Sequence, residues 1–299
     1  IATRKSPLAL WQAEQVKSLL EQNPEIKCQL IPLKTTGDRF SQDTIAYDTG
    51  KALFVKELEE SLLTQEADIA VHSMKDVPIH LPPNCEIKAY IQRGDPRDCF
   101  LSSQKNLSSL NAGSVVGTSS LRRAAILHHL YPNLKIKKIR GNVGTRLEKL
   151  TNQEYDGLIL AAAGLTRLNL QDSIKQYFSV DEFIPAINQG IIGVECLKQN
   201  TEITKILEKI NHLPTQLVAE TERAFNKKLG GSCHTPIAGY AFIYQQELHF
   251  LGLVADPTSN KYLKITEIGE VNNHLKLGEK AAQKLLDQGA DEILKNFQN

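Results

Sequence analysis

Residues 114–130 read SVVGTSSLRRAAILHHL, a short apolar segment that runs through small polar residues into a helical pattern. The segment 114–117 predicts a strand, and the stretch toward Leu130 predicts a helix. Alternation of short apolar runs with amphipathic helices is typical of βα units around a largely parallel sheet. The sequence therefore predicts an α/β fold.

The same alternation extends to both sides of this segment. Before it, Ser6-Pro7 predicts a helix N-cap with proline at the first helical position, ahead of the apolar-periodic residues 8–20. After it, a turn at 140–146 leads into another helix. The other predicted elements of the two series are strands at 1–4, 27–33, 67–71, around 136 and at 157–161, and a helix over 52–64. Two similar α/β lobes are expected.

Two interruptions and a change of character predict the domain boundaries. The pattern breaks near 93–96 and again at 185–190, and a strand over 191–196 could return to the first lobe. From Pro214 onward the pattern predicts a small α+β domain. Its expected elements are a helix to residue 229, strands over 237–243, 248–255 and 262–269, and a final helix over 275–297. The expected domains are a first lobe of 1–92 and 190–212, a second lobe of 95–185, and an α+β domain of 213–299.

Length and composition indicate a globular protein with more than one core. A chain of 299 residues is longer than most chains that fold around a single hydrophobic core. Its contents of 41% hydrophobic and 23% charged residues are typical of globular proteins. No run of about 18 apolar residues occurs, so a membrane span is not expected. The five cysteines lack CxxC spacing, which favours a reducing compartment over disulfides or a zinc site. Ile1 already belongs to a predicted strand, so the sequence leaves open whether a targeting segment precedes it.

Positive charge is concentrated between residues 122 and 149, where only Glu148 opposes eight basic residues. Several of these follow predicted strands, where ligands of open α/β sheets bind. Arginine pairs bidentately with carboxylates and phosphates, and helix N-termini add partial positive charge. A polyanionic ligand is predicted, with a solvated basic face as the alternative. The net charge of +1 and the lack of interleaved aromatic residues disfavour nucleic acid.

Two further residues are candidates for chemistry. Asp76 follows Lys75 after a predicted strand. Such an aspartate often only caps a turn. In a cleft lined with cations, however, it would stabilise developing positive charge and transfer protons. Cys233 follows paired glycines that predict a helix C-cap. His234 raises the option of a metal site, but no second Cys/His pair supports it, and no metal is expected. An accessible loop thiol suits covalent attachment.

Four segments resemble the signature segments of porphobilinogen deaminases (hydroxymethylbilane synthases), in the order of that family. They are HSMKDVP at 72–78, GTSSLRR at 117–123, RGNVGTR at 140–146 and GGSC at 230–233. The resemblance covers nearly the whole chain. It implies two lobes like those of type II periplasmic binding proteins, joined by hinge strands, and a third domain with a three-stranded sheet and helices on one face.

The resemblance also implies an activity and a cofactor. The family comprises transferases that join four porphobilinogen units head to tail, lose ammonia at each step and release hydroxymethylbilane for haem biosynthesis. The product grows on a dipyrromethane cofactor held through a thioether by the cysteine that matches Cys233. Each pyrrole carries an acetate and a propionate, which explains a need for many arginines.

The resemblance assigns roles to individual residues. Asp76 would hydrogen-bond pyrrole nitrogens and stabilise the azafulvene cation formed when ammonia leaves. Implied cofactor-binding residues are Cys233, Ser73, Lys75, Thr118, Ser120, Arg122, Arg123, Arg140, Asn142 and Arg146. Implied substrate-binding residues are Arg4, Ser6, Lys51, Arg140, Arg146, Arg167 and Gln189. Family members often carry a lysine where the polar 34–51 loop has Tyr47, so Lys51 alone is expected to act there.

Two functions of other classes stay open. A solute-binding protein would account for two lobes and an anion site, but not for Cys233 and the third domain. A nucleic-acid-binding protein would use only the basic stretch. The family resemblance further implies a cytoplasmic monomer that acts on a small molecule, with neither nucleic acid nor a membrane as partner.

Overall fold

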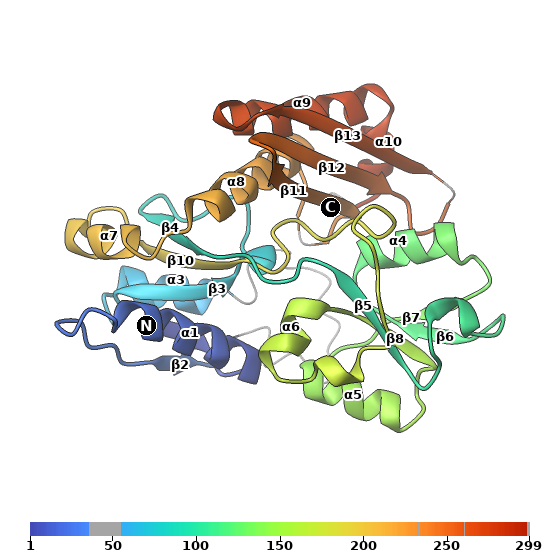
Figure 1. The fold of residues 1–299 in the computed structure, drawn as a ribbon, viewed down its shortest axis with the longest axis horizontal. Helices are drawn as coiled ribbons and strands as arrows, with labels where there is room; N and C mark the ends of the chain where they lie inside the picture. Colours follow the sequence, from blue (N-terminus) through green and yellow to red (C-terminus); the bar gives the residue numbers. More distant parts are fainter. Residues whose placement is uncertain (36–54, 233, 260, 298–299) are drawn as a thin grey trace. The chain divides into compact units, whose positions relative to one another are not determined.

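The computed structural model describes residues 1–35, 55–232, 234–259 and 261–297 of the chain (Figure 1). These residues belong to two compact units. The first unit comprises Ile1–Gly94 and Gly190–Gln216, and the second comprises Asp95–Gln189 and Leu217–Asn299. Each unit combines sheets with helices, which confirms the predicted α/β class.

The first unit is built on a five-stranded mixed sheet of order β2-β1-β3-β10-β4. Its strands are β1 (Ala2–Arg4), β2 (Ile31–Leu33), β3 (Ile69–Ser73), β4 (Cys85–Ile91) and β10 (Ile192–Leu197). β1 pairs parallel with β2 and β3, whereas β10 is antiparallel to β3 and β4. The predicted return of the 191–196 segment to the first sheet is confirmed.

Helices cover both faces of this sheet. The helices are α1 (Pro7–Leu20), α3 (Lys56–Leu63) and α7 (Thr201–Glu208). Val16 of α1 and Leu207 of α7 share a core with Val71, whereas Leu58 of α3 packs with Ala70 on the other face. The alternation of side chains along β3 thus buries both of its faces. α1 begins as predicted, with Ser6 as its N-cap and proline at its first position.

The second unit contains another five-stranded sheet, of order β7-β6-β8-β5-β9. Its strands are β5 (Asp98–Ser102), β6 (Val115–Gly117), β7 (Lys135–Lys137), β8 (Gly157–Ala161) and β9 (Gln176–Tyr177). β6 pairs parallel with β7 and β8, and β5 is antiparallel to β8 and β9. In both sheets the fourth position of the order is taken by an antiparallel strand, so the two lobes are similar, as predicted.

Three helices pack on this second sheet. They are α4 (Leu121–Leu130), α5 (Val143–Thr151) and α6 (Ala162–Arg167). Ile126 of α4 shares a core with Phe100 and Ile159, whereas Leu165 of α6 packs with Leu158 on the opposite face. β8 therefore has apolar residues at successive positions because both of its faces are buried.

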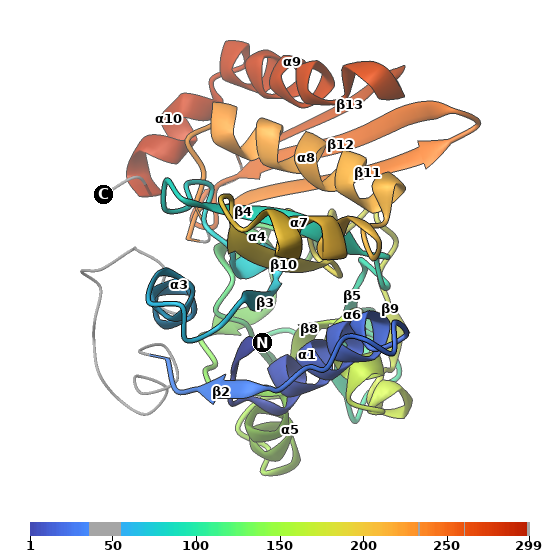
Figure 2. The ribbon, with the colours of Figure 1, turned by 90° about the vertical axis from the view of Figure 1, so that its left-hand side faces the viewer.

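The C-terminal part of the second unit is a three-stranded antiparallel sheet with helices on one face. Its elements are α8 (Leu213–Lys228), whose residues up to Gln216 belong to the first unit, and β11 (Ile237–Tyr244), β12 (Glu247–Ala255), β13 (Tyr262–Glu270), α9 (His274–Asp287) and α10 (Ala290–Leu294). Phe225 of α8 and Leu285 of α9 pack with Phe250, and α9 lies along β13 in both views (Figures 1 and 2). The other face packs Leu251 and Leu253 in the core of α4 and the second five-stranded sheet.

Several sequence predictions need correction. The helix expected over 275–297 is broken, because Gly289 has φ +91° and separates α9 from α10. The strand expected over 27–33 is only Ile31–Leu33. β4 and β5 were not predicted; β5 is a short strand with polar residues at both ends. The division of the second unit into a lobe of 95–185 and a domain of 213–299 stays a prediction.

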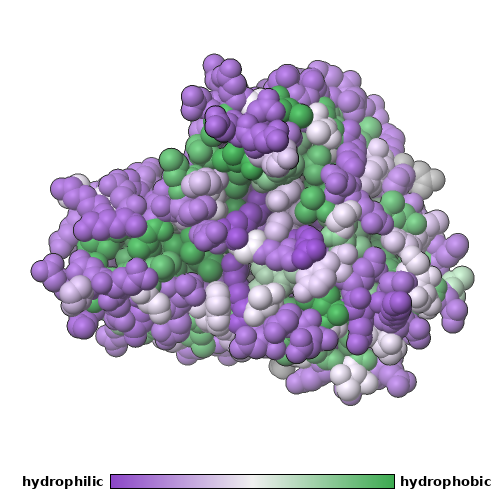
Figure 3. All heavy atoms as spheres, in the orientation of Figure 1, coloured by the Kyte–Doolittle hydropathy of each residue, from purple (hydrophilic) through white to green (hydrophobic). Residues whose placement is uncertain are grey.

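The surface shown in Figure 3 is mostly hydrophilic, with apolar side chains in separate groups. Such scattered exposed apolar residues are ordinary in globular domains. In the described part of the chain, no helix has the length and apolar character needed to cross a membrane.

Candidate functional site

The predicted site residues of the first unit gather at one edge of its sheet. Arg4 ends β1 and Ser73 ends β3, and these parallel strands are neighbours. The 3₁₀ turn η2 (Met74–Asp76) follows β3 directly and carries Lys75 and Asp76. The carboxyl edge of parallel strands is where open α/β sheets bind ligands.

The turn that carries Asp76 is held in place by the buried residue Met74. Met74 is 1% exposed, its N–H donates to Ile191 O at 3.0 Å, and its side chain lies against Gly193, where an added Cβ would collide with it. The Asp76 side chain is exposed. The carboxylate is thus presented to solvent on a well-packed turn.

Two further predicted site residues of this unit take part in side-chain hydrogen bonds. Ser73 Oγ and the Gln12 amide exchange hydrogen bonds, with Gln12 Nε2 donating at 2.8 Å. Ser6 Oγ accepts from the Ala9 N–H at 3.3 Å and so caps α1. Both hydroxyls therefore have a structural partner, and Ser6 keeps its own hydrogen to donate to a ligand.

Behind this edge lies a buried group of ionisable side chains that sequence reasoning missed. His72 Nε2 and Glu195 Oε2 are 2.7 Å apart, joining β3 to β10. Burial, together with the charge of Glu195, raises the pKa of Glu59 on α3 to about 7. Burial likewise raises the pKa of Cys85 to about 12, and Glu195 adds to this. Nothing in the sequence pattern marks these residues, because their pairing joins strands about 120 residues apart.

The predicted site residues of the second unit follow three neighbouring parallel strands. Residues 118–123 follow β6, residues 140–146 follow β7, and Arg167 lies on α6 after β8. Ser119 Oγ donates to Ile139 O at 2.6 Å and joins the first two of these segments. The structure therefore brings the predicted arginines of this unit to a single sheet edge.

The polar residues at this edge differ in accessibility. Arg140 is exposed, and Arg146 is half-buried with its Nε donating to Gly141 O at 2.8 Å. Asn142 and Ser120 cap α5 and α4 by accepting backbone N–H groups at 3.0 and 3.4 Å. Burial lowers the pKa of Arg167 to about 10, so it stays cationic at neutral pH and would be stabilised by an anion.

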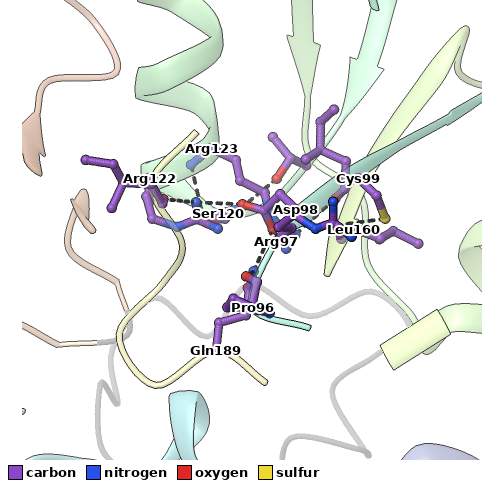
Figure 4. Close-up of polar contacts among 12 residues, drawn as sticks. Pro96, Arg97, Asp98, Cys99, Ser120, Arg122, Arg123, Leu160 and Gln189 are labelled. Atoms are coloured by element: carbon purple, nitrogen blue, oxygen red, sulfur yellow. Dashed lines mark hydrogen bonds and ion pairs between the residues drawn. The ribbon is translucent and has the colours of Figure 1, made fainter. Parts of the chain in front are cut away.

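Arg122 and Arg123 converge on a buried carboxylate, Asp98 (Figure 4). Arg122 Nη1 lies 2.7 Å from Asp98 Oδ2, and Arg123 Nη2 lies 2.7 Å from Oδ1. Burial alone would raise the pKa of Asp98, but the two guanidinium groups hold it well below its usual value. Asp98 lies at the start of β5, which the sequence did not predict, so no signal pointed to it.

Gln189 also belongs to this cluster. It is 1% exposed, and its Nε2 donates to Pro96 O at 2.7 Å and to Asp98 Oδ1 at 3.0 Å. Its amide nitrogen is thus already bonded inside the protein, and its role in substrate binding stays a prediction. Thr118, 4% exposed, is also engaged locally, since its Oγ1 accepts from the Ser120 N–H at 3.2 Å.

Cys233, Lys51 and Tyr47 lie outside the described residues, as does most of the 34–51 segment. The flanking residues show the predicted helix C-cap: Gly230 has φ +65°, and its N–H donates to Lys227 O at 3.0 Å. In the described ranges, no group of three or more His, Cys, Asp or Glu side chains could hold a metal ion.

Both parts of the chain match models of known families. Residues 1–205 match "Porphobilinogen deaminase, dipyromethane cofactor binding domain", and residues 216–287 match "Porphobilinogen deaminase, C-terminal domain". The chain belongs to the porphobilinogen deaminase family. The first match includes every described candidate residue, from Arg4 to Gln189, and the second includes Cys233.

Curated porphobilinogen deaminases match over nearly the full length. Those of Coxiella burnetii strains Dugway 5J108-111 and RSA 331 / Henzerling II are each 45% identical over 298 residues, covering 99% of this chain and 97% of the relative. The family resemblance that the four sequence motifs predicted is therefore confirmed.

Solved structures with a related chain path include periplasmic proteins. The periplasmic VFT2 domain of BvgS from Bordetella pertussis is 16% identical with a TM-score of 0.40, covering 67% of this chain and 76% of that one. A TRAP periplasmic solute binding protein from Desulfovibrio salexigens is 13% identical with a TM-score of 0.40, covering 71% and 72%.

The dipyrromethane cofactor of the family fits the residues present. Two buried guanidinium groups share one carboxylate, so the cluster of Arg122, Arg123 and Asp98 carries an excess positive charge. Among the described residues, Arg122 Nε has no hydrogen-bond acceptor, although that atom is buried. A pyrrole carboxylate would neutralise the charge and accept that hydrogen bond.

Proposed function

We propose that this chain condenses four porphobilinogen molecules head to tail on a covalently bound dipyrromethane, with loss of ammonia, and releases hydroxymethylbilane. The reaction makes the chain a transferase of tetrapyrrole biosynthesis. Membership of the porphobilinogen deaminase family over nearly the whole chain carries the proposal.

The cationic sheet edges suit substrates of this kind. Every pyrrole of the growing product carries an acetate and a propionate, so negative charge increases with each step. Arginine binds such carboxylates through paired, charge-assisted hydrogen bonds. The residues proposed to bind cofactor and substrate carboxylates are Arg4, Ser6, Ser73, Lys75, Thr118, Ser120, Arg122, Arg123, Arg140, Asn142, Arg146 and Arg167, with Lys51 and Gln189 as further candidates for substrate.

Asp76 is proposed as the catalytic residue. A carboxylate accepts hydrogen bonds from pyrrole N–H groups, and its negative charge stabilises the cation that develops on the substrate when ammonia leaves. Asp76 is exposed at the carboxyl edge of its sheet, on a turn fixed by the buried Met74. A fixed carboxylate needs little reorganisation during the reaction, which is the condition for efficient electrostatic stabilisation.

The cofactor is proposed to be held by Cys233 through a thioether. When bound, dipyrromethane supplies the terminal pyrrole whose free α-carbon takes the first substrate. The arginines named above would hold its carboxylates through charge-assisted hydrogen bonds. Covalent attachment keeps the growing product on the enzyme between steps.

We infer a first lobe of 1–92 and 190–212, a second lobe of 95–185 and an anchor-bearing domain of 213–299. We also infer a cytoplasmic monomer whose partner is porphobilinogen, with neither nucleic acid nor a membrane bound.

The direct test is turnover of porphobilinogen by the purified chain. Ammonia release and linear tetrapyrrole, followed by mass spectrometry, should appear in a ratio of four to one. A solute-binding protein would instead bind porphobilinogen without releasing ammonia, and that outcome would contradict the proposed function.

A further inference from the structure

The cluster around Asp98 places cations where a helix disfavours them. Arg122 and Arg123 lie in the first turn of α4, which has no acidic residue there. The N-terminus of a helix carries partial positive charge, so cations in its first turn are repelled. Both arginines are also buried, with 3% and 7% of their surfaces exposed, which adds a desolvation cost. Their positions therefore require a strong counter-ion.

Asp98 is that counter-ion, and it binds the two arginines differently. Arg123 uses all three of its nitrogens on the protein: Nε and Nη2 donate to Asp98 Oδ1 at 3.1 and 2.7 Å, and Nη1 donates to Ile159 O at 3.0 Å. Arg122 has Nη1 near Asp98 Oδ2 and Ile184 O, both at 2.7 Å, while its Nε has no acceptor among the described residues. Arg122 thus keeps a donor for a further anion.

Asp98 is itself held by two interactions, one through its backbone and one through its side chain. It starts β5, where it pairs with Ala161 of β8 in the second sheet. The Gln189 amide donates to its Oδ1 from another segment, and the same amide donates to Pro96 O. Its side chain is fully buried, so the carboxylate has one orientation and its position sets that of both guanidinium groups.

We propose that Asp98 is a positioning residue of the condensation reaction: it orients Arg122 so that the free Nε side of the guanidinium meets a pyrrole carboxylate. The inference rests on the proposed function, because it takes the anion to be a carboxylate of cofactor or substrate. Asp98 acts through Arg122 and touches no reacting atom.

The test variant is Asp98→Asn, which keeps the shape of the side chain and removes its charge. The two possible roles of Asp98 predict changes of KM that are opposite in sign. If Asp98 only offsets positive charge, its removal strengthens the cationic field and the KM for porphobilinogen falls. If it positions Arg122, the repelling guanidinium groups lose their shared partner. We then expect KM to rise about tenfold, with kcat of the cofactor-loaded fraction changed less than about threefold.

A matched control comes from the same unit. Glu267 is a buried carboxylate bonded to two cations, Lys280 and Lys284, on the C-terminal sheet and α9. Glu267→Gln should lower stability to a similar degree but leave KM and cofactor loading unchanged. An equal rise of KM in both variants would show that Asp98 acts through stability alone.

A second variant covers the case in which Asp98→Asn does not fold. Gln189→Met removes the hydrogen bond to Asp98 but keeps all three charges, and should raise KM about threefold. An unchanged or lower KM in the folded variants overturns the positioning role. A wild-type chain without turnover or covalent dipyrromethane would instead refute the proposed function itself.

Discussion

At the scale of single residues, the polar side chains near the candidate sites are of two kinds, exposed and buried. Asp76 and Arg140 are exposed at sheet edges, whereas Asp98, His72 and Glu195 are buried. Substitutions of the first kind should change chemistry without changing the fold. Substitutions of the second kind should act on both.

Asp76→Ala should lower turnover by about a thousandfold, because the variant loses the carboxylate that stabilises the developing cation. Its thermal unfolding should match the wild type, since the side chain is exposed. Steady-state ammonia release and calorimetry measure the two effects. Asp68→Ala, at another exposed aspartate of the same unit, serves as the control. Near-normal turnover in Asp76→Ala would rule out its catalytic role.

Arg146→Leu should stall elongation and leave enzyme-bound intermediates with fewer than four added pyrroles, visible by intact mass. Arg146 is tested in preference to Arg122 because it is only half-buried, whereas Arg122 is buried and paired with Asp98. Lys149→Leu, further along the same helix, is the control. Complete products from Arg146→Leu at the normal rate would show that Arg146 holds no essential carboxylate.

Glu59 gives the first unit a pH-dependent stability. Its pKa is raised from 4.5 to about 7 in the folded chain, by burial and by the charge of Glu195. The folded state therefore binds the proton more tightly than the unfolded state, and stability falls as pH rises from 4.5 toward 7. Glu59→Gln removes this fall. The free energy of unfolding of the variant minus that of the wild type should therefore be more positive at pH 8 than at pH 5, by at most about 3 kcal/mol. Urea unfolding at both pH values measures the difference; a constant difference would contradict the assignment.

At the scale of elements, β6, α4 and β8 could be predicted closely, whereas the helix α6 was not predicted. Local signals determine β6, α4 and β8: apolar runs, and the small polar residues that separate β6 from α4. β5 could not be predicted, because its burial depends on β8 and β9 far along the chain. The break between α9 and α10 depends on the single backbone conformation of Gly289.

The contact between α8 and α9 requires a glycine. An added Cβ at Gly278 would collide with the backbone oxygen of Thr221 on α8. Gly278→Ala should therefore destabilise the second unit by about 1–3 kcal/mol, despite the better helix propensity of alanine. Gly144→Ala is the control, since a Cβ there would meet only Asn142 Oδ1 at 3.4 Å. Denaturant unfolding that shows Gly278→Ala as stable as Gly144→Ala would contradict this packing.

At the scale of the whole molecule, the four sequence motifs identify the family, and the structure adds what surrounds them. The positions of the arginines after parallel strands were predictable, because strand ends share an edge. The packing of the C-terminal sheet on the core of α4 was not, since Leu251 and Leu253 meet Phe100 only in the folded unit. The Asp98 cluster was missed for the same reason.

The chain is proposed to carry a covalent dipyrromethane on Cys233 and to extend it with porphobilinogen. Intact-mass spectrometry of the purified chain tests this most directly. The wild-type protein should be heavier than its sequence by two linked pyrroles, and further by one pyrrole for each porphobilinogen added, whereas Cys233→Ser should show the bare sequence mass and no turnover. A fully active wild-type preparation at the bare sequence mass would show that no cofactor is covalently attached to Cys233.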